Sequence, residues 1–208
     1  MAQEYLPAAG RDRFLPLYDP LTRLLGCQAA IRPLIAQAQL APGMHVLDLG
    51  CGTGTVAVRI ATEHPDVRIT ALDPDPLALV RASRKAARAR VSIAFDQGFG
   101  EQLPYADRSF DRVLSSMMFH HLRREVRAAV LSEIHRVLRP GGRLELLDFA
   151  GGAHTSLAQL LHGNHLDAAA EDRLIRRMGE AGLSGATRVA SRKTLVGVIA
   201  YYQASRAN

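Results

Sequence analysis

The sequence contains few cysteines, few lysines and no long apolar run. Its 208 residues include only two cysteines, Cys27 and Cys51, which excludes a disulfide framework and favours a reducing, cytoplasmic location. No apolar segment approaches the roughly 20 residues that a membrane-spanning helix needs, so stable insertion into a membrane is not expected. Residues 1–5 lack the basic start and the apolar stretch of a signal peptide.

Basic residues outnumber acidic ones, and the formal net charge is +6. Such a balance is compatible with binding to nucleic acid or to an anionic membrane surface. Only Lys85 and Lys193 are lysines, and the arginines are scattered over several expected helices. The densest basic run, residues 81–90, lacks the interleaved aromatic residues that stack on bases, so nucleic acid is not expected as a partner.

The stretch that organises the chain is residues 46–54, with the sequence Val-Leu-Asp-Leu-Gly-Cys-Gly-Thr-Gly. An apolar run that ends in a carboxylate and alternating glycines predicts a strand, a tight turn and the start of a helix. Glycine fits there because it lacks the Cβ that would hinder a sharp turn or a close ligand. The pattern therefore predicts a nucleotide-like ligand above the end of a central strand.

Two classes of ligand use such a turn. Residues 52–57 can be interpreted as the fingerprint of a dinucleotide site, so an NAD-dependent oxidoreductase is one hypothesis. Asp48 favours another ligand, because its carboxylate repels a pyrophosphate and attracts ammonium and sulfonium groups. S-adenosylmethionine carries both of these positive charges, and its own carboxylate can use the N-terminus of the helix.

Residues 46–54 resemble the first motif of class I S-adenosylmethionine-dependent methyltransferases. From about residue 44 to residue 202, the chain is similar to their small, soluble subgroup, which includes the ubiquinone/menaquinone-biosynthesis C-methyltransferases. The resemblance implies transfer of a methyl group to the carbon, nitrogen or oxygen of a small-molecule acceptor, with S-adenosylhomocysteine as the product. A protein that binds S-adenosylmethionine without turnover is the alternative.

Alternating strands and helices predict a doubly wound, mainly parallel α/β sheet in one domain, residues 1–208. The resemblance implies seven strands in the Rossmann-like order 3-2-1-4-5-7-6, with strand 7 antiparallel and helices on both faces. Within the domain we expect a helical N-terminal cap at 1–40, a cofactor-binding core at 41–150, and a substrate-side segment with a C-terminal hairpin at 151–208. A monomer and a homodimer are both compatible with this arrangement.

Element boundaries follow from periodicity and from breakers. A helix is expected from Leu21 to Ala38, split or kinked at Gly26 and Pro33. Pro76 suits the first turn of a later helix. After the first strand, the expected strands are residues 67–73, 91–95, 110–116, 143–149, 186–194 and 196–202. The remaining helices are expected after Gly54, over 126–137 with a closing turn at 139–142, and over 171–181.

By resemblance, the cofactor site comprises the glycine turn, the end of the second strand and the residues that follow the third and fourth strands. Asp73 would accept hydrogen bonds from the ribose, or else cap the next helix, a role that Asp75 can take instead. Cys51 is either a small residue that fits the turn or a reactive thiol. The expected cofactor residues are Asp48, Gly50, Cys51, Gly52, Gly54, Asp73, Pro74, Gly98, Phe99, Ser116 and Met117.

Phe99 departs from the family pattern G-D-A-E-x-L-P that residues 98–104 otherwise resemble. The family has an aspartate there, which accepts a bond from the adenine amino group, and phenylalanine cannot do so. Phe99 would instead cover the adenine ring opposite Pro74, with Gln97 or Glu101 as a replacement acceptor. The alternative is that Phe99 belongs to the hydrophobic core.

The acceptor end of the site is expected near a Ser-Ser-Met-Met-Phe-His-His-Leu segment, residues 115–122, that follows the fourth strand. His120 or His121 could act as a general base near neutral pH, or be a structural histidine. Tyr18 could reach the cofactor or the acceptor, or simply pack. No metal is expected, because the spacing of three further histidines matches no known ligand pattern; these are His154, His162 and His165.

Overall fold

The computed structural model describes residues 27–150, 168–194 and 197–208, and its strands form one seven-stranded sheet. The strand order is β3-β2-β1-β4-β5-β7-β6, which confirms the order that the family resemblance implied. Neighbouring strands from β3 to β5 pair in parallel, and β7 pairs antiparallel with both β5 and β6. The strands are β1 His45–Leu49, β2 Arg68–Asp73, β3 Ala94–Gln97, β4 Phe110–Ser116, β5 Leu138–Phe149, β6 Leu183–Thr194 and β7 Gly197–Arg206.

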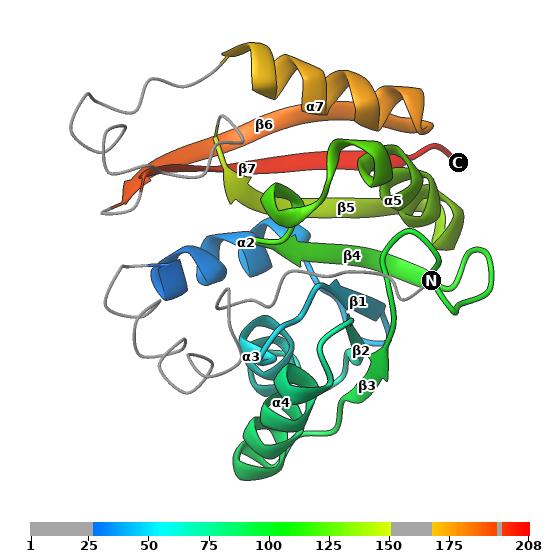
Figure 1. The fold of residues 1–208 in the computed structure, drawn as a ribbon. Helices are drawn as coiled ribbons and strands as arrows, with labels where there is room; N and C mark the ends of the chain where they lie inside the picture. Colours follow the sequence, from blue (N-terminus) through cyan, green and yellow to red (C-terminus); the bar gives the residue numbers. More distant parts are fainter. Residues whose placement is uncertain (1–26, 151–167, 195–196) are drawn as a thin grey trace.

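Helices cover both faces of this sheet (Figure 1). Val46 and Leu47 are adjacent in β1 and belong to different hydrophobic cores, because successive side chains of a strand point to opposite faces. Val46 packs in the core of α2 and α3, and Leu47 packs in the core of α5 and α7. The helices are η2 Cys27–Ala30, α2 Ile31–Ala38, α3 Thr55–Glu63, α4 Pro76–Ala89, η3 Phe119–His121, α5 Arg124–Val137 and α7 Ala168–Glu180.

The N-terminal helix differs from its prediction. Pro33 lies in the first turn of α2, where a backbone N–H would have no partner within the helix, so the proline fits there. Pro33 therefore does not split α2, and Gly26 lies outside the described residues. The start of α4 is as predicted, because Pro76 is its first residue and Asp75 accepts bonds from the N–H groups of Leu77 and Ala78.

Two strand boundaries also differ from the prediction. Residues 91–93 are not in β3, because the N–H of Val91 donates to Ala86 O and completes the end of α4. In addition, α5 passes directly into β5 at Leu138, five residues before the predicted start. The expected closing turn, residues 139–142, is instead an irregular section of β5, where the pairing with β4 shifts register between Phe110 and Arg112.

The carboxyl ends of β1, β2, β4 and β5 lie along one edge of the sheet, since these strands run parallel. The loops that follow them carry most of the predicted site residues. In Figure 1, α4 lies beside β2 and β3, and α7 lies beside β6 at the opposite side of the sheet. Within the described ranges, no helix has both the length and the apolar character needed to cross a membrane.

Candidate functional site

The three glycines of the turn after β1 have different physical roles. All three adopt positive φ angles, which L-residues with a side chain rarely adopt. A Cβ at Gly50 would collide with the side chain of Met118, and a Cβ at Gly54 would lie 2.8 Å from the Cβ of Ala82 on α4. A Cβ at Gly52 would meet nothing within 4 Å. The open side of the turn is therefore at Gly52, where a ligand can approach the backbone.

The turn is fastened to the neighbouring strand. The N–H groups of Gly50 and Cys51 both donate to Leu72 O in β2, at 2.9 and 3.0 Å. Burial raises the pKa of the Cys51 thiol well above its ordinary value, so this side chain is not an activated nucleophile. The structure thus favours the interpretation of Cys51 as a small residue that fits the turn.

Asp48 lies beneath the turn and is 1% exposed. Its Oδ2 accepts a bond of 3.0 Å from the N–H of Ala57, in the first turn of α3. Burial raises the pKa of Asp48 to about 7, and the nearby Asp73 carboxylate adds to this rise. Asp48 therefore anchors the start of α3. Because its side chain is buried, Asp48 can attract a cationic ligand only by electrostatic interaction at a distance and not by direct contact.

Asp73 joins the end of β2 to the glycine turn. Its Oδ2 accepts a bond of 2.7 Å from the N–H of Gly52, and its Oδ1 accepts one of 3.0 Å from the N–H of Asp75. Asp75 caps α4, so helix capping, the alternative role considered for Asp73, belongs to Asp75. Burial raises the pKa of Asp73. Each carboxylate oxygen has two acceptor positions, which leaves capacity for ribose hydroxyls beside Gly52.

The segment expected to hold the adenine follows β3. The N–H of Gly98 donates to Asp73 O at 3.2 Å, and the Nε2 of Gln97 donates to Pro74 O at 3.2 Å. Phe99 is half-buried and is a member of neither hydrophobic core of the described residues. Gln97 and Gly98 lie beside Pro74 and Asp73.

A polar clamp from α5 fixes the chain that continues from this segment. The Oε2 of Glu133 accepts a bond of 2.7 Å from the N–H of Leu103. Arg136 donates to Leu103 O, to Tyr105 O and to both carboxylate oxygens of Glu133, at 2.7–3.0 Å. These bonds hold the loop after Phe99 against α5.

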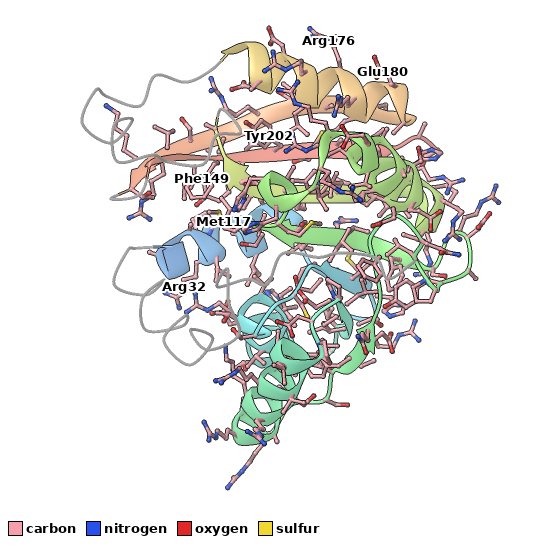
Figure 2. All side chains as sticks on the ribbon, viewed as in Figure 1. Arg32, Met117, Phe149, Arg176, Glu180 and Tyr202 are labelled. Atoms are coloured by element: carbon pink, nitrogen blue, oxygen red, sulfur yellow. The ribbon has the colours of Figure 1, made fainter. Side chains whose placement is uncertain are left out.

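The end of β4 brings the acceptor-side residues to the turn. Met117 has φ +57, a conformation that costs a non-glycine residue about 1–3 kcal/mol, and its N–H donates to Leu147 O at 2.7 Å. Figure 2 labels Met117 and Phe149, which lie at the ends of β4 and β5. The next residue, Met118, packs on Gly50 and so connects β4 to the glycine turn.

His120 forms a dyad with a residue that the sequence analysis did not identify. Its Nδ1 lies 2.6 Å from the Oδ1 of Asp148, near the end of β5, and its N–H donates to the Oδ2 at 3.0 Å. Asp148 is 3% exposed, and its Oδ1 also accepts from the N–H of Phe149. The rings of His121 and Phe149 pack on the His120 ring, at centroid distances of 3.9 and 5.0 Å. The sequence signal that could have identified Asp148 was an acidic residue near the end of an expected strand.

Lys85 is a second residue that the sequence analysis did not assign to the site. It lies on α4, and its Nζ donates to the hydroxyls of Thr55 and Thr53 at 2.8 and 3.2 Å. Both threonines belong to the segment in which the glycine turn becomes α3. The sequence placed Lys85 only within a basic helix, because nothing local indicates which way its side chain points.

Several other residues considered in the sequence analysis lie outside the described residues. Tyr18 and the histidines at 154, 162 and 165 lie in ranges that the structure does not describe. Among the residues it does describe, no group of three or more His, Cys, Asp and Glu side chains could hold a metal ion. Ser116 ends β4 and is half-buried next to Met117.

Comparison with known proteins favours one of the two interpretations of the glycine turn. Residues 46–142 match a family model described as a methyltransferase domain. A demethylmenaquinone methyltransferase of Deinococcus radiodurans is 39% identical over 137 residues, which cover 64% of this chain and 56% of that relative. A 27-O-demethylrifamycin SV methyltransferase of Amycolatopsis mediterranei is 38% identical over 140 residues, which cover 66% and 48% of the two chains.

The chain also has the fold of a solved methyltransferase. A S-adenosylmethionine-dependent methyltransferase from Aquifex aeolicus superposes with a TM-score of 0.67 at 16% identity, covering 91% of this chain and 98% of the other. This likeness shows the fold alone. The chain spans about half the length of the two curated relatives. The demethylmenaquinone methyltransferase confirms the expected resemblance to the quinone-methylating subgroup.

Proposed function

We propose that this protein is a S-adenosylmethionine-dependent methyltransferase that acts on a small-molecule acceptor. The observation that carries the proposal is the turn itself, which opens at Gly52 beside the Asp73 carboxylate, in a segment that matches a methyltransferase-domain model. The negative charge of Asp73, together with that of Asp48 above its pKa of about 7, favours a ligand with sulfonium and ammonium groups over a pyrophosphate. The NAD-dependent alternative lacks this electrostatic match.

The proposed cofactor site runs along the carboxyl ends of four neighbouring strands, β3, β2, β1 and β4. Gly50, Gly52 and Gly54 shape the turn against which the methionine part lies, with Ser116 and Met117 at its far end. Asp73 holds the ribose, and the adenine lies between Pro74 and Phe99. The N–H of Gly98 is bonded to Asp73 O, so the ribose and adenine positions are fixed to one another.

The methyl transfer is a displacement in line at the sulfonium. The acceptor atom forms a bond to the methyl carbon while the sulfur–methyl bond breaks, and the sulfur keeps the electron pair as S-adenosylhomocysteine is formed. An acceptor hydroxyl or activated carbon must lose a proton to a base. His120 fits this role, because an Nδ1–H donated to Asp148 puts the basic lone pair on Nε2 and stabilises the imidazolium.

The names of the two relatives suggest the first acceptors to test, because they contain the compounds demethylmenaquinone and 27-O-demethylrifamycin SV. We propose that the methyl group is transferred to a hydroxyl group or a ring carbon of a quinone-like or aromatic compound. Incubation with methyl-labelled S-adenosylmethionine and a panel of such acceptors, followed by mass spectrometry, tests the proposal. A mass gain of one methyl group supports it, and absence of transfer to every acceptor with intact cofactor binding favours the binding protein without turnover.

We also propose a single domain over residues 1–208 and a cytoplasmic location. The free, buried thiol of Cys51 is consistent with a reducing compartment. Residues 1–40 would contribute a cap and residues 151–208 a substrate-side segment, with Tyr18 near the acceptor. Light scattering coupled to gel filtration separates a monomer from a homodimer, and limited proteolysis tests whether one stable unit contains the described strands.

A further inference from the structure

A half-buried arginine lies on the core-facing side of α5. Arg127 shares this side with Val130 and Leu131, because residues three and four positions apart lie on one face of a helix. Val130 and Leu131 are fully buried in the core between α5 and the sheet, whereas Arg127 is half-buried. The chain enters α5 from the end of β4, so Arg127 lies toward the carboxyl edge of the sheet, where the proposed site is.

One hydrogen bond attaches Arg127 to the segment that carries the proposed base. The Nε of Arg127 donates to Leu122 O at 3.0 Å. Leu122 directly follows η3, and its N–H donates to Phe119 O, at the start of this short helix, at 3.1 Å. His120 lies in the middle of η3 and is bonded to Asp148. The guanidinium is therefore held two positions along the chain from the imidazole of the dyad.

The charges around Arg127 leave a positive excess. Burial lowers the pKa of the Arg127 guanidinium, and the Asp148 carboxylate opposes this effect. The other charges within reach are two arginines that lower this pKa and one acid that raises it; these are Arg177, Arg124 and Glu125. Arg177 reaches the group from α7, where it donates to Arg124 O at 3.4 Å. Three positive charges face two negative ones, and this balance favours an anion as ligand.

The hydrogen bonds of the dyad occupy Asp148. Its two oxygens accept bonds from His120 and from the N–H of Phe149, and within the described ranges it forms no ion pair with Arg127. A guanidinium has five N–H donors, and the described part of the chain supplies one acceptor to Arg127, the carbonyl of Leu122. The two terminal nitrogens can therefore bind a planar oxyanion in the bidentate manner.

We propose that Arg127 determines acceptor specificity by binding a carboxylate of the methyl acceptor, so that a hydroxylated aromatic acid is the preferred class of acceptor. The inference rests on the proposed function and deepens it. A carboxylate fits the guanidinium because both of its oxygens accept bonds in one plane. Arg127 would hold the acid group of the acceptor while His120 takes the proton from the reacting hydroxyl.

Matched pairs of ligands test this inference directly. A set of hydroxynaphthoic acids and their carboxamides keeps the ring and the hydroxyl constant and changes only the charge. In calorimetric titration into wild-type protein saturated with S-adenosylhomocysteine, at least one acid should bind about 10- to 100-fold more tightly than its carboxamide, the range expected for hydrogen bonds between charged groups. With methyl-labelled cofactor, kcat/KM should favour that acid by a similar factor.

Three variants assign the preference to one side chain. In Arg127→Met, the affinity for the acid should fall about 10- to 100-fold, whereas that for the carboxamide should stay within about threefold. Arg127→Lys keeps the charge without the planar group and should retain part of the preference. Arg123→Met removes a positive charge from the exposed residue that precedes α5 and should leave both affinities within about twofold, because solvent and salt screen that charge.

The outcomes that overturn the inference are distinct from failure of the proposed function. Equal binding of every acid and its carboxamide, or no binding of any acid, contradicts the role of Arg127. An equal loss of both ligands in Arg127→Met also contradicts it and indicates a role at the shared hydroxyl. If Arg127→Met does not fold, Arg127→Gln removes the charge with a polar side chain and must show the same loss of preference. Wild-type protein that binds neither S-adenosylmethionine nor S-adenosylhomocysteine would instead refute the proposed function.

Discussion

The hydrogen bond between His120 and Asp148 fixes an imidazole ring at the acceptor end of the site. In His120→Gln, we expect kcat to fall about 10²- to 10⁴-fold, which is the usual contribution of a general base, with the KM for S-adenosylmethionine changed only a few-fold. Asp148→Asn should lower kcat in the same direction, because it removes the charge that stabilises the imidazolium. Steady-state kinetics with an acceptor from the panel proposed above measure both values.

His121 provides the matched control for that pair. Its ring packs on His120 but the Asp148 carboxylate is bonded to His120, so His121→Gln should retain much more activity. A His121 variant as inactive as the His120 variant, or an Asp148→Asn enzyme with the wild-type rate, would contradict the assignment of the base.

Substitutions at Gly52 and Gly54 should affect ligand binding and stability to different extents, although both residues belong to one turn. Gly54→Ala introduces a Cβ 2.8 Å from Ala82 at a positive φ, and we expect it to lower the free energy of unfolding by about 2–4 kcal/mol. Gly52→Ala meets no neighbour and should cost about 1 kcal/mol, but it fills the open side of the turn and should weaken S-adenosylmethionine binding at least tenfold. Urea unfolding and calorimetric titration measure the two effects, and equal stability losses in both variants would contradict the assignment.

Among the secondary-structure elements, the C-terminal end of α5 depends on one residue from the end of the sheet. Arg206, the last residue of β7, donates from one guanidinium nitrogen to His135 O, Arg136 O and Leu138 O at 2.8–2.9 Å. These carbonyls end a helix and attract a cation. The side chain therefore joins β7 to the helix whose Glu133 and Arg136 hold Leu103 and Tyr105.

Arg206→Met should lower the free energy of unfolding by about 1–3 kcal/mol, because buried carbonyl oxygens lose a charged donor. Arg192→Met, on the exposed part of β6, is the control and should change stability by less than about 0.5 kcal/mol. Chemical unfolding monitored by circular dichroism measures the difference. Equal stabilities of the two variants would show that this bridge contributes nothing to the fold.

At the scale of the whole molecule, two buried carboxyl groups couple stability to pH. Burial raises the pKa of both Asp48 and Glu145 to about 7, and Glu145 lies under α2, where it accepts a bond from Gln37 and pairs with Arg143. The folded state holds these protons more tightly than the unfolded chain. Their stabilisation is complete below about pH 4 and is lost as the pH rises through about 7.

Asp48→Asn and Glu145→Gln should remove this dependence. Between pH 5 and pH 8, we expect the wild type to lose about 5 kcal/mol relative to the double variant, about half of it from each group. Comparison with the variant is needed because burial lowers the pKa of His45 and His135, which shifts stability in the opposite direction. Urea unfolding across this range measures the difference, and parallel pH profiles of the two proteins would contradict it.

The sequence predicts the glycine turn because a local pattern determines it, and the sheet order was predicted only through the family resemblance that this pattern carries. It does not predict the ends of β3 and β5, since their limits depend on pairing and on the end of α4. Asp148 and Lys85 were missed for a similar reason: their partners, His120, Thr53 and Thr55, are 28 to 32 positions away in the chain. Hydrogen bonds of this kind depend on the folded arrangement of several strands and helices, which no local pattern specifies.

The most direct test of the account is calorimetric titration of the wild type and of Asp73→Ala with S-adenosylmethionine, S-adenosylhomocysteine and NADH. We predict micromolar binding of the first two ligands by the wild type, no binding of NADH, and loss of affinity in the variant, because Asp73 supports both Gly52 and the ribose. Binding of NADH without binding of S-adenosylmethionine would contradict the account and restore the dinucleotide interpretation of the turn.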